Sequence, residues 1–339
     1  MGVLRLCVGV GQKAIHEERR EAAGRQSHFR EVFKQFSDIF RRDYLGSKAH
    51  AAGLYVMLSF IFLIMCLVAA LARFSGASSL PPQRIVSLGP AVTEKLYLLG
   101  LEKNIAGVTV YCQRPKAALE KPKIGTVTGI NVEKVAALKP DLVIATSLTD
   151  PRSVKKLKNL GIKVAVFEEP ESFDEMNGQF IEMGRLTGKE REATKIARTS
   201  LDKVKRMRAA AKELTRPKVF LQIGANPLFA AAKESLLNDF IEFSDGVNII
   251  QDGKGGLLSR ERVLAVNPDV ILIVAMEGAV AESEKVRWQR FGTMKAVRDG
   301  AVYVMDPYKM CSPTPVTFVE ALETVAGLLH PGRRERDRQ

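Results

Sequence analysis

The chain has 339 residues, of which 46% are hydrophobic, so it can bury the core of one large domain or of two ordinary ones. Its 51 basic and 38 acidic side chains leave a net charge of +13, but this charge is dispersed through segments of mixed sign, which disfavours a nucleic-acid surface. The 4 cysteines form no CxxC pair, which excludes a zinc ribbon and a thioredoxin motif. One disulfide between Cys112 and Cys311 stays open, and we expect two free thiols.

Residues 51–72 form an uncharged run of 22 residues, AAGLYVMLSFIFLIMCLVAALA, which is long enough to span a bilayer as a helix. Two arginines and a lysine precede it, which predicts a cytoplasmic N-terminus and export of the rest. Two interpretations stay open. Either residues 51–72 are an uncleaved membrane anchor behind a basic cytoplasmic segment 1–50, or residues 51–77 hold a cleaved signal peptide and translation starts downstream of Met1.

From residue 84 onward, strand-like and helix-like segments alternate. The alternation predicts a parallel α/β sheet in an N-terminal lobe at residues 84–187. Gly100 and Gly161 follow two of the predicted helices and would end them. We expect strands at 84–88, 105–110, 142–145 and 163–167, and helices at 92–99, 132–138 and 153–160.

No glycine or proline lies between Gly188 and Pro217, and apolar residues keep helical spacing through this stretch. Residues 188–216 are therefore predicted to form one long helix that links the first lobe to a second α/β lobe at 217–330. In the second lobe we expect strands at 218–222 and 301–305 and helices at 236–243 and 317–328, followed by a charged, disordered tail at 331–339.

One unit occurs in both predicted lobes. Residues 132–144 read VEKVAALKPDLVI, and residues 260–272, 128 positions later, read RERVLAVNPDVIL. A helix–turn–strand unit repeated at this distance predicts two similar lobes with a ligand cleft between them. The repeat places Glu133 and Glu261 in the first turn of a short helix, where the helix dipole alone favours a carboxylate. Because both lobes carry one, we expect the two carboxylates to dock on basic pockets of a two-fold partner.

Three histidines precede the lobes and His330 ends the second one, so none is available inside a lobe. This distribution disfavours a Ser-His-Asp triad, a Cys-His pair and a His-rich zinc site, and no Walker A string occurs. We therefore expect a binding protein that is not an enzyme and has no catalytic residues, metal ligands or cofactor. The alternative class is a membrane-anchored sensor or enzyme that reuses the same two-lobe fold.

Ligand contacts are expected in the loops that follow strand ends, as in other α/β sheets. These loops are neutral and modestly apolar, and their aromatic side chains suit a bulky ligand with a large apolar face. The candidate ligand-binding residues are Pro90, Tyr111, Val127, Thr128, Ser147, Asn226, Phe229, Met276 and Tyr308.

Four strings carry a family resemblance that covers residues 84–330: RIVSLGPAVTEKLYLLGL, GINVEKVAALKPDLVIAT, VFLQIGANPLFAAAKES and SRERVLAVNPDVILIV. They resemble the periplasmic substrate-binding proteins of ABC importers for cobalamin and iron–siderophore complexes. The resemblance implies two α/β lobes joined by one long helix and delivery of a metal chelate to a permease dimer with its ATPase subunits. It also implies that Glu133 and Glu261 engage permease arginines.

The resemblance bears less firmly on ligand identity. The string VFLQIGANPLFAAAKES is most similar to the cobalamin-binding branch, and Tyr111 matches a tyrosine that contacts the corrin there. Val127 stands where that branch has a tryptophan, and Thr126 stands where haem-binding relatives have an iron-ligating tyrosine. The arginine usual in siderophore binders is absent from residues 311–315. A corrinoid and a ferric siderophore both stay open.

Overall fold

The computed structural model describes residues 61–62, 65, 81–211, 216–251, 256–275 and 278–331. The chain divides into two compact units, and the unit from Leu80 onward contains both lobes. The predicted basic segment 1–50, nearly all of the predicted signal or anchor at 51–77, and the tail beyond residue 331 lie outside the described residues. Within the described part, no helix is both long enough and apolar enough to cross a membrane.

Four parallel strands form the sheet of the N-lobe in the order β2-β1-β3-β4. Helix α3 covers one face of this sheet, and α4 and α5 cover the other, so the central strands β1 and β3 are buried. The strands are β1 (Ile85–Ser87), β2 (Ile105–Val108), β3 (Leu142–Thr146) and β4 (Val164–Phe167). The helices are α3 (Pro90–Leu98), α4 (Val132–Ala137) and α5 (Pro151–Asn159), with 3-10 turns η1 (Glu102–Asn104) and η2 (Lys116–Glu120).

The C-lobe sheet has the order β10-β9-β5-β6-β8, with β7 also paired to β5. Its strands are β5 (Lys218–Gly224), β6 (Phe229–Ala230), β7 (Val247–Asn248), β8 (Gly256–Leu257), β9 (Val270–Ile273) and β10 (Val302–Val304). Strands β5, β7, β9 and β10 are parallel, whereas β6 pairs antiparallel with both β5 and β8. Its helices are α8 (Leu236–Phe243), α9 (Arg260–Val266), α10 (Gly278–Gln289), α11 (Lys295–Arg298) and α12 (Pro307–Cys311).

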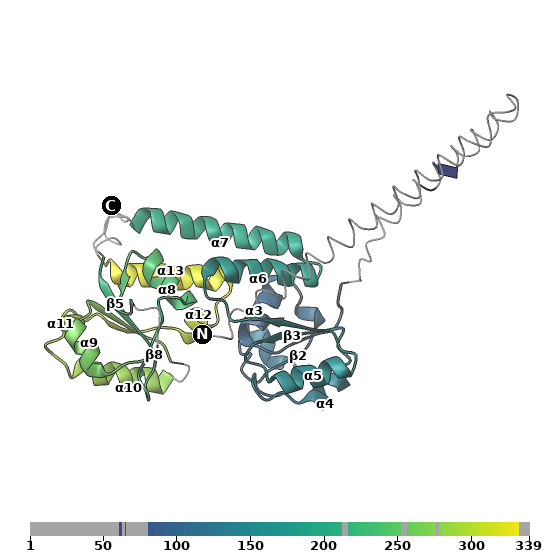
Figure 1. Cartoon of the computed structure of the whole chain (residues 1–339), viewed down its shortest axis with the longest axis horizontal. Helices are drawn as coiled ribbons and strands as arrows, with labels where there is room; N and C mark the ends of the chain where they lie inside the picture. The colour runs from purple at the N-terminus through teal and green to yellow at the C-terminus, as the bar shows by residue number, and fades with distance from the viewer. Residues whose placement is uncertain are drawn as a thin grey trace, which may run out of the picture. The chain divides into compact units, whose positions relative to one another are not determined.

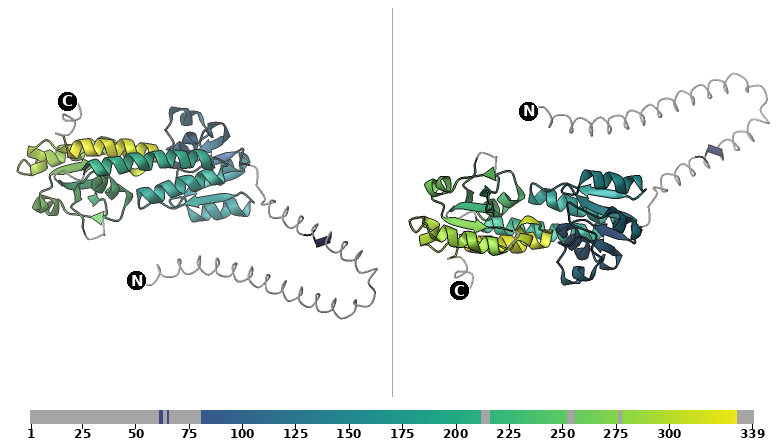
Figure 2. Two further views of the ribbon diagram at one scale, coloured as in Figure 1. Left: turned by 90° about the horizontal axis from the view of Figure 1, so that it is seen from above. Right: turned by 90° about the horizontal axis from the view of Figure 1, so that it is seen from below.

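Three helices form a layer that runs along both lobes: α6 (Phe173–Leu186), α7 (Glu190–Ala211) and α13 (Pro315–Leu329). Figure 1 shows this layer above the two sheets, and the view from above in Figure 2 shows the three helices side by side. Helix α7 has 22 residues and is therefore about 33 Å long. Its early residues Ala193 and Ala197 belong to the N-lobe core, and Val204 belongs to the C-lobe core. The fold predicted from the sequence, two α/β lobes joined by a long helix, is confirmed, and α6 is an addition to it.

Helix α6 also spans both cores. Phe173 at its start packs in the C-lobe core, and Phe180 packs in the N-lobe core. The backbone N–H of Phe173 donates to Asp239 of α8 at 2.7 Å, which ties the start of α6 to the C-lobe. At Gly184 the helix approaches α7 so closely that an added Cβ would lie 2.5 Å from the Ala193 Cβ. Glycine at this position therefore permits the close contact between the two helices that connect the lobes.

The repeated sequence unit has the same local structure in each lobe. Asn131 and Ser259 cap α4 and α9, and each side chain accepts the backbone N–H three positions along, at 2.7 and 3.2 Å. After each helix one residue has positive φ, with φ 46 at Lys139 and φ 48 at Asn267. The chain then turns into the next strand of its sheet, so the helix–turn–strand unit predicted from the repeat is confirmed.

The aspartate of each Pro-Asp pair fastens this unit to the first strand of its lobe. Asp141 Oδ2 accepts the backbone N–H of Arg84 at 2.9 Å, and Asp269 Oδ2 accepts that of Lys218 at 2.7 Å. The backbone N–H groups of the two aspartates donate back to the carbonyls of the same partners, at 2.9 and 2.8 Å. The Pro-Asp pair of the repeat therefore makes the same backbone pairing at the base of each sheet.

A substitution at Gly184 tests how much the fold depends on the contact between α6 and α7. We expect Gly184→Ala to lower the free energy of unfolding by about 1–3 kcal/mol, because the added methyl overpacks the helix contact. Gly178 lies on the same helix with nothing within 4 Å of an added Cβ, so Gly178→Ala should raise it by about 0.5–1 kcal/mol through helix propensity. Denaturant unfolding of the two variants measures both free energies. If Gly178→Ala were destabilised and Gly184→Ala were unaffected, the fold would not depend on the close contact at Gly184.

Candidate functional site

The predicted N-lobe contacts lie in loops at the carboxyl edge of its sheet. Pro90 begins α3 after β1, Tyr111 follows β2 and is 49% exposed, and Ser147 is exposed directly after β3. Val127 and Thr128 lie in the loop 125–130, which hydrogen-bonds to the segment after β2. Parallel strands bring their carboxyl ends to one edge, so the four loops share one side of the lobe.

The predicted C-lobe contacts come from two places. Asn226 lies in the turn between β5 and β6 and is exposed, and Phe229, the first residue of β6, is 37% exposed. Tyr308 lies in α12 and is partly buried. Met276 lies outside the described residues. Contact of these residues with a ligand stays a prediction.

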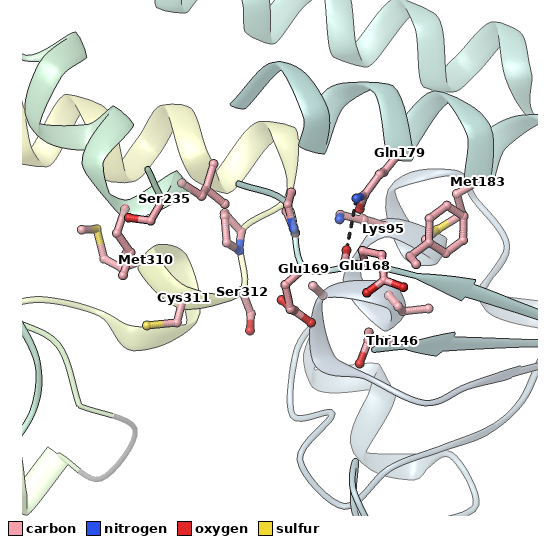
Figure 3. Close-up of a pocket in the computed structure, with 17 residues that line it drawn as sticks. Lys95, Thr146, Glu168, Glu169, Gln179, Met183, Ser235, Met310, Cys311 and Ser312 are labelled. Carbon is pink, nitrogen blue, oxygen red and sulfur yellow. Dashed lines mark hydrogen bonds between the residues drawn. The ribbon is translucent and has the colours of Figure 1, made fainter. Parts of the chain in front are cut away.

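A cavity of about 210 Å³ lies between the two lobes beneath the helical layer (Figure 3). Its lining residues come from α3, from the ends of β3 and β4, from α6, from the start of α8 and from the end of α12 and the loop after it. They are Ala91, Val92, Lys95, Thr146, Phe167, Glu168, Glu169, Pro170, Gln179, Met183, Ser235, Leu236, Leu237, Met310, Cys311, Ser312 and Pro313.

None of the nine predicted ligand-binding residues belongs to this lining, although three of them are close neighbours of it in sequence. Ala91 follows Pro90, Thr146 precedes Ser147, and Met310 lies two positions after Tyr308. The polar residues that the sequence did not single out come from α3, the end of β3, α6, the loop after β4, the N-cap of α8 and the loop after α12. The loop after β4 could have been predicted to contact a ligand, since it follows a predicted parallel strand as the other candidate loops do.

Lys95 is the most unusual residue of the cavity. It is 6% exposed, it shares the buried face of α3 with Val92 and Leu96, and its Nζ forms no hydrogen bond or close ion pair with any described residue. Burial lowers the pKa of Lys95 to about 8, and the nearby Glu169 carboxylate acts in the opposite direction. Burial likewise raises the pKa of Glu169, which Lys95 partly offsets. At neutral pH the cavity therefore contains a cation and an acidic group that are not neutralised by direct contact.

Arg114 joins the two lobes through elements that also contribute to the cavity wall. Its Nε donates to Glu94 of α3 at 3.0 Å, and its Nη1 donates to Asp306, the N-cap of α12, at 3.3 Å. The same guanidinium lies 4.9 Å from the ring centroid of Tyr308. Burial raises the pKa of Glu94, although Arg114 acts to lower it. The predicted contact residue Tyr308 is thus held in place by a side chain of the opposite lobe.

Glu133 and Glu261 both lie exposed in the first turn of a short helix, as the sequence predicts. The backbone N–H at its own position and the Ser259 hydroxyl lower the pKa of Glu261, which keeps this side chain ionised. Equivalent positions in the repeated units place one carboxylate on each lobe. Docking through the pair stays a prediction.

Buried polar contacts hold α9 in place beneath Glu261. Glu284 of α10 is fully buried and binds Arg260 and Arg287, the latter at 2.9 Å. Gln222 of β5 donates to Glu284 at 2.8 Å and accepts from the Trp288 indole at 2.7 Å. The Arg260 guanidinium also lies 4.6 Å from the centroid of the Trp288 ring. Because a buried carboxylate needs its partners, this network fixes the residue that directly precedes Glu261.

The sequence matches the periplasmic binding protein family over residues 85–309, which is more than half of the chain. The chain belongs to the periplasmic binding protein family. The uncharacterized ABC transporter substrate-binding lipoprotein YvrC of Bacillus subtilis is 29% identical over 258 residues, covering 74% of this chain and 81% of that protein. The vitamin B12-binding protein of Salmonella choleraesuis is 30% identical over 205 residues, covering 60% of this chain and 76% of that protein.

A solved structure agrees with this family assignment. The periplasmic vitamin B12 binding protein BtuF of Vibrio cholerae matches with a TM-score of 0.64 and 27% identity, covering 75% of this chain and 98% of that one. This chain has the two-lobe fold of that periplasmic binding protein.

The pKa of Lys95 predicts a pH dependence of stability. The folded pKa of about 8 lies below the ordinary 10.5, so folding disfavours the proton, and stability should rise as the pH rises from 8 to 10.5. Lys95→Met should remove this rise and stabilise the protein at pH 7 by about 3 kcal/mol, the equivalent of the pKa difference. The free energy of unfolding of the unmodified protein and of Lys95→Met, measured at several pH values between 7 and 11, tests this prediction. The exposed Lys155→Met serves as the control. Parallel stability profiles of Lys95→Met and the unmodified protein would contradict the prediction.

Proposed function

We propose that this chain is the substrate-binding component of an ABC importer and carries a metal chelate, with a corrinoid as the first choice and a ferric siderophore as the alternative. The observation that carries the proposal is the cavity between two lobes that a helical layer joins. The vitamin B12-binding names of two relatives support a corrinoid. These relatives are binding proteins, and we propose that this chain likewise binds without turnover.

Capture is non-covalent in this proposal. Tyr111, Phe229 and Tyr308 supply apolar ring surface from both lobes for a large planar ligand. Helices α6 and α7 pack into both cores, so they restrict the lobes to limited closure rather than wide hinge opening. The Arg114 contacts to Asp306 and Tyr308 cross between the lobes and favour the closed arrangement.

Residues 51–72 determine how the binding protein stays near the permease. We propose that the lobes are extracytoplasmic, in the periplasm where such a compartment exists. They are soluble if the signal segment is cleaved and tethered to the inner membrane if it is retained.

Calorimetric titration tests the ligand. The purified protein is titrated with cyanocobalamin and, separately, with a panel of ferric siderophores. We expect saturable one-to-one binding of cyanocobalamin. Binding of a siderophore alone would replace the corrinoid by the alternative, and binding of neither would overturn the proposal of a chelate carrier.

Reversal of the two exposed carboxylates tests docking. We expect the double variant Glu133→Lys, Glu261→Lys to lose at least tenfold in ligand uptake with its cognate permease, because like charges replace attraction to permease arginines. Ligand affinity should change less than twofold, since both residues lie outside the cavity lining. The matched control, Glu120→Lys with Glu323→Lys, reverses two exposed glutamates on other elements. Normal uptake by the first variant would show that the two glutamates do not dock.

A further inference from the structure

The cavity between the lobes contains two hydrogen-bond donors that lack partners. Lys95 Nζ has none among the described residues, and the Thr146 hydroxyl is buried without a partner. Buried polar groups in folded proteins are hydrogen-bonded in the great majority of cases, so each of these donors calls for an acceptor that the described chain does not supply. A lysine that is 94% buried is rarely retained in an apolar helix position without such a role.

The same cavity offers two acceptors. Gln179 Nε2 donates to the carbonyl of Glu168 at 3.1 Å, drawn as a dashed line in Figure 3, which leaves its Oε1 without a donor from the described chain. The Glu169 carboxylate lies near Lys95 but forms no ion pair with it. These acceptors lie on the N-lobe side of the cavity with Lys95, opposite Cys311 and Ser312 of the C-lobe.

We propose that this cavity binds one primary carboxamide arm of a corrinoid, with Lys95 and Thr146 donating to the amide oxygen and Glu169 and Gln179 accepting from the amide nitrogen. The inference rests on the proposed function and names the part of the ligand that these residues recognise. A primary amide is the common group that has an acceptor oxygen and a two-proton donor on one carbon. The volume of about 210 Å³ holds a side arm, whereas a whole ligand of drug size takes about 300–1,000 Å³.

Other substituents fit these residues less well. A carboxylate would accept from Lys95 but would face the Glu169 carboxylate, an ammonium would face Lys95, and an apolar group would leave Lys95 unpaired. The cavity therefore discriminates between the amide arms of a corrinoid and the propionate arms of a haem.

The test compares amide and acid forms of one ligand. The full chain, Lys95→Met and Glu169→Gln are titrated with cyanocobalamin and with its monocarboxylic acids, each made by hydrolysing one amide and titrated separately. We expect one acid to bind the unmodified protein at least tenfold more weakly than cyanocobalamin, and the others to bind within threefold. Lys95→Met should bind cyanocobalamin at least tenfold more weakly, because a hydrogen bond to a charged donor is lost. Glu169→Gln should restore most of the affinity for the disfavoured acid.

The outcomes separate this inference from the proposed function. Cyanocobalamin binding to the unmodified protein supports the corrinoid carrier, whatever the variants do. If Lys95→Met and Glu169→Gln then bind every form within twofold of the unmodified protein, the carboxamide site is overturned and the carrier stands. An equal loss for all ligands in both variants would indicate a structural role and would also overturn it. Absence of corrinoid binding would overturn the carboxamide site and the corrinoid as ligand, and the chelate carrier would then depend on the siderophore titration.

Discussion

The contact between α6 and α7 is the constraint on which the rest of the structure depends. Each helix contributes side chains to both lobe cores, so the position of one lobe relative to the other follows from how closely the helices approach. Gly184 permits that approach by leaving no Cβ between the helix axes. Hinge motion about this layer would cost buried packing in both cores. Two residues of α6, Gln179 and Met183, also line the cavity.

Burial of Lys95 in the cavity lowers the stability of the fold. A lysine in an apolar helix position destabilises the fold at neutral pH, since burial disfavours its charged form. A ligand that supplies an acceptor offsets this cost only when it is bound.

Glu133 and Glu261 occupy equivalent positions in the repeat, but different contacts hold their two helices in place. The α4 helix relies on the Asn131 cap and on apolar packing of Val132 and Val135. The α9 helix has the Ser259 cap and, in addition, the buried contacts of Arg260 with Glu284 and Trp288. A partner that contacts both lobes would therefore meet similar charges on differently supported helices.

The sequence by itself determined the elements whose pattern is local. Periodicity predicted β1, β3, α7 and α13, the repeat predicted that α4 and α9 would carry an exposed glutamate each, and the distribution of histidine disfavoured most catalytic sites. The predicted helices and strands are confirmed because helical spacing, strand runs and capping residues act over a few neighbouring positions.

Tertiary structure alone decided what surrounds the cavity. Helix α6 was not predicted, and the strands β6, β7 and β8 have two residues each, too few to show an alternation. Lys95 is part of an ordinary-looking string, TEKLYL, and becomes notable only when α3 is buried beside β4 and α6. The partners of a side chain come from segments far apart in the chain, and no local pattern encodes which of those segments will meet. The sequence therefore determined the two lobes and their link, and the packing of the helical layer decided which residues face one another between them.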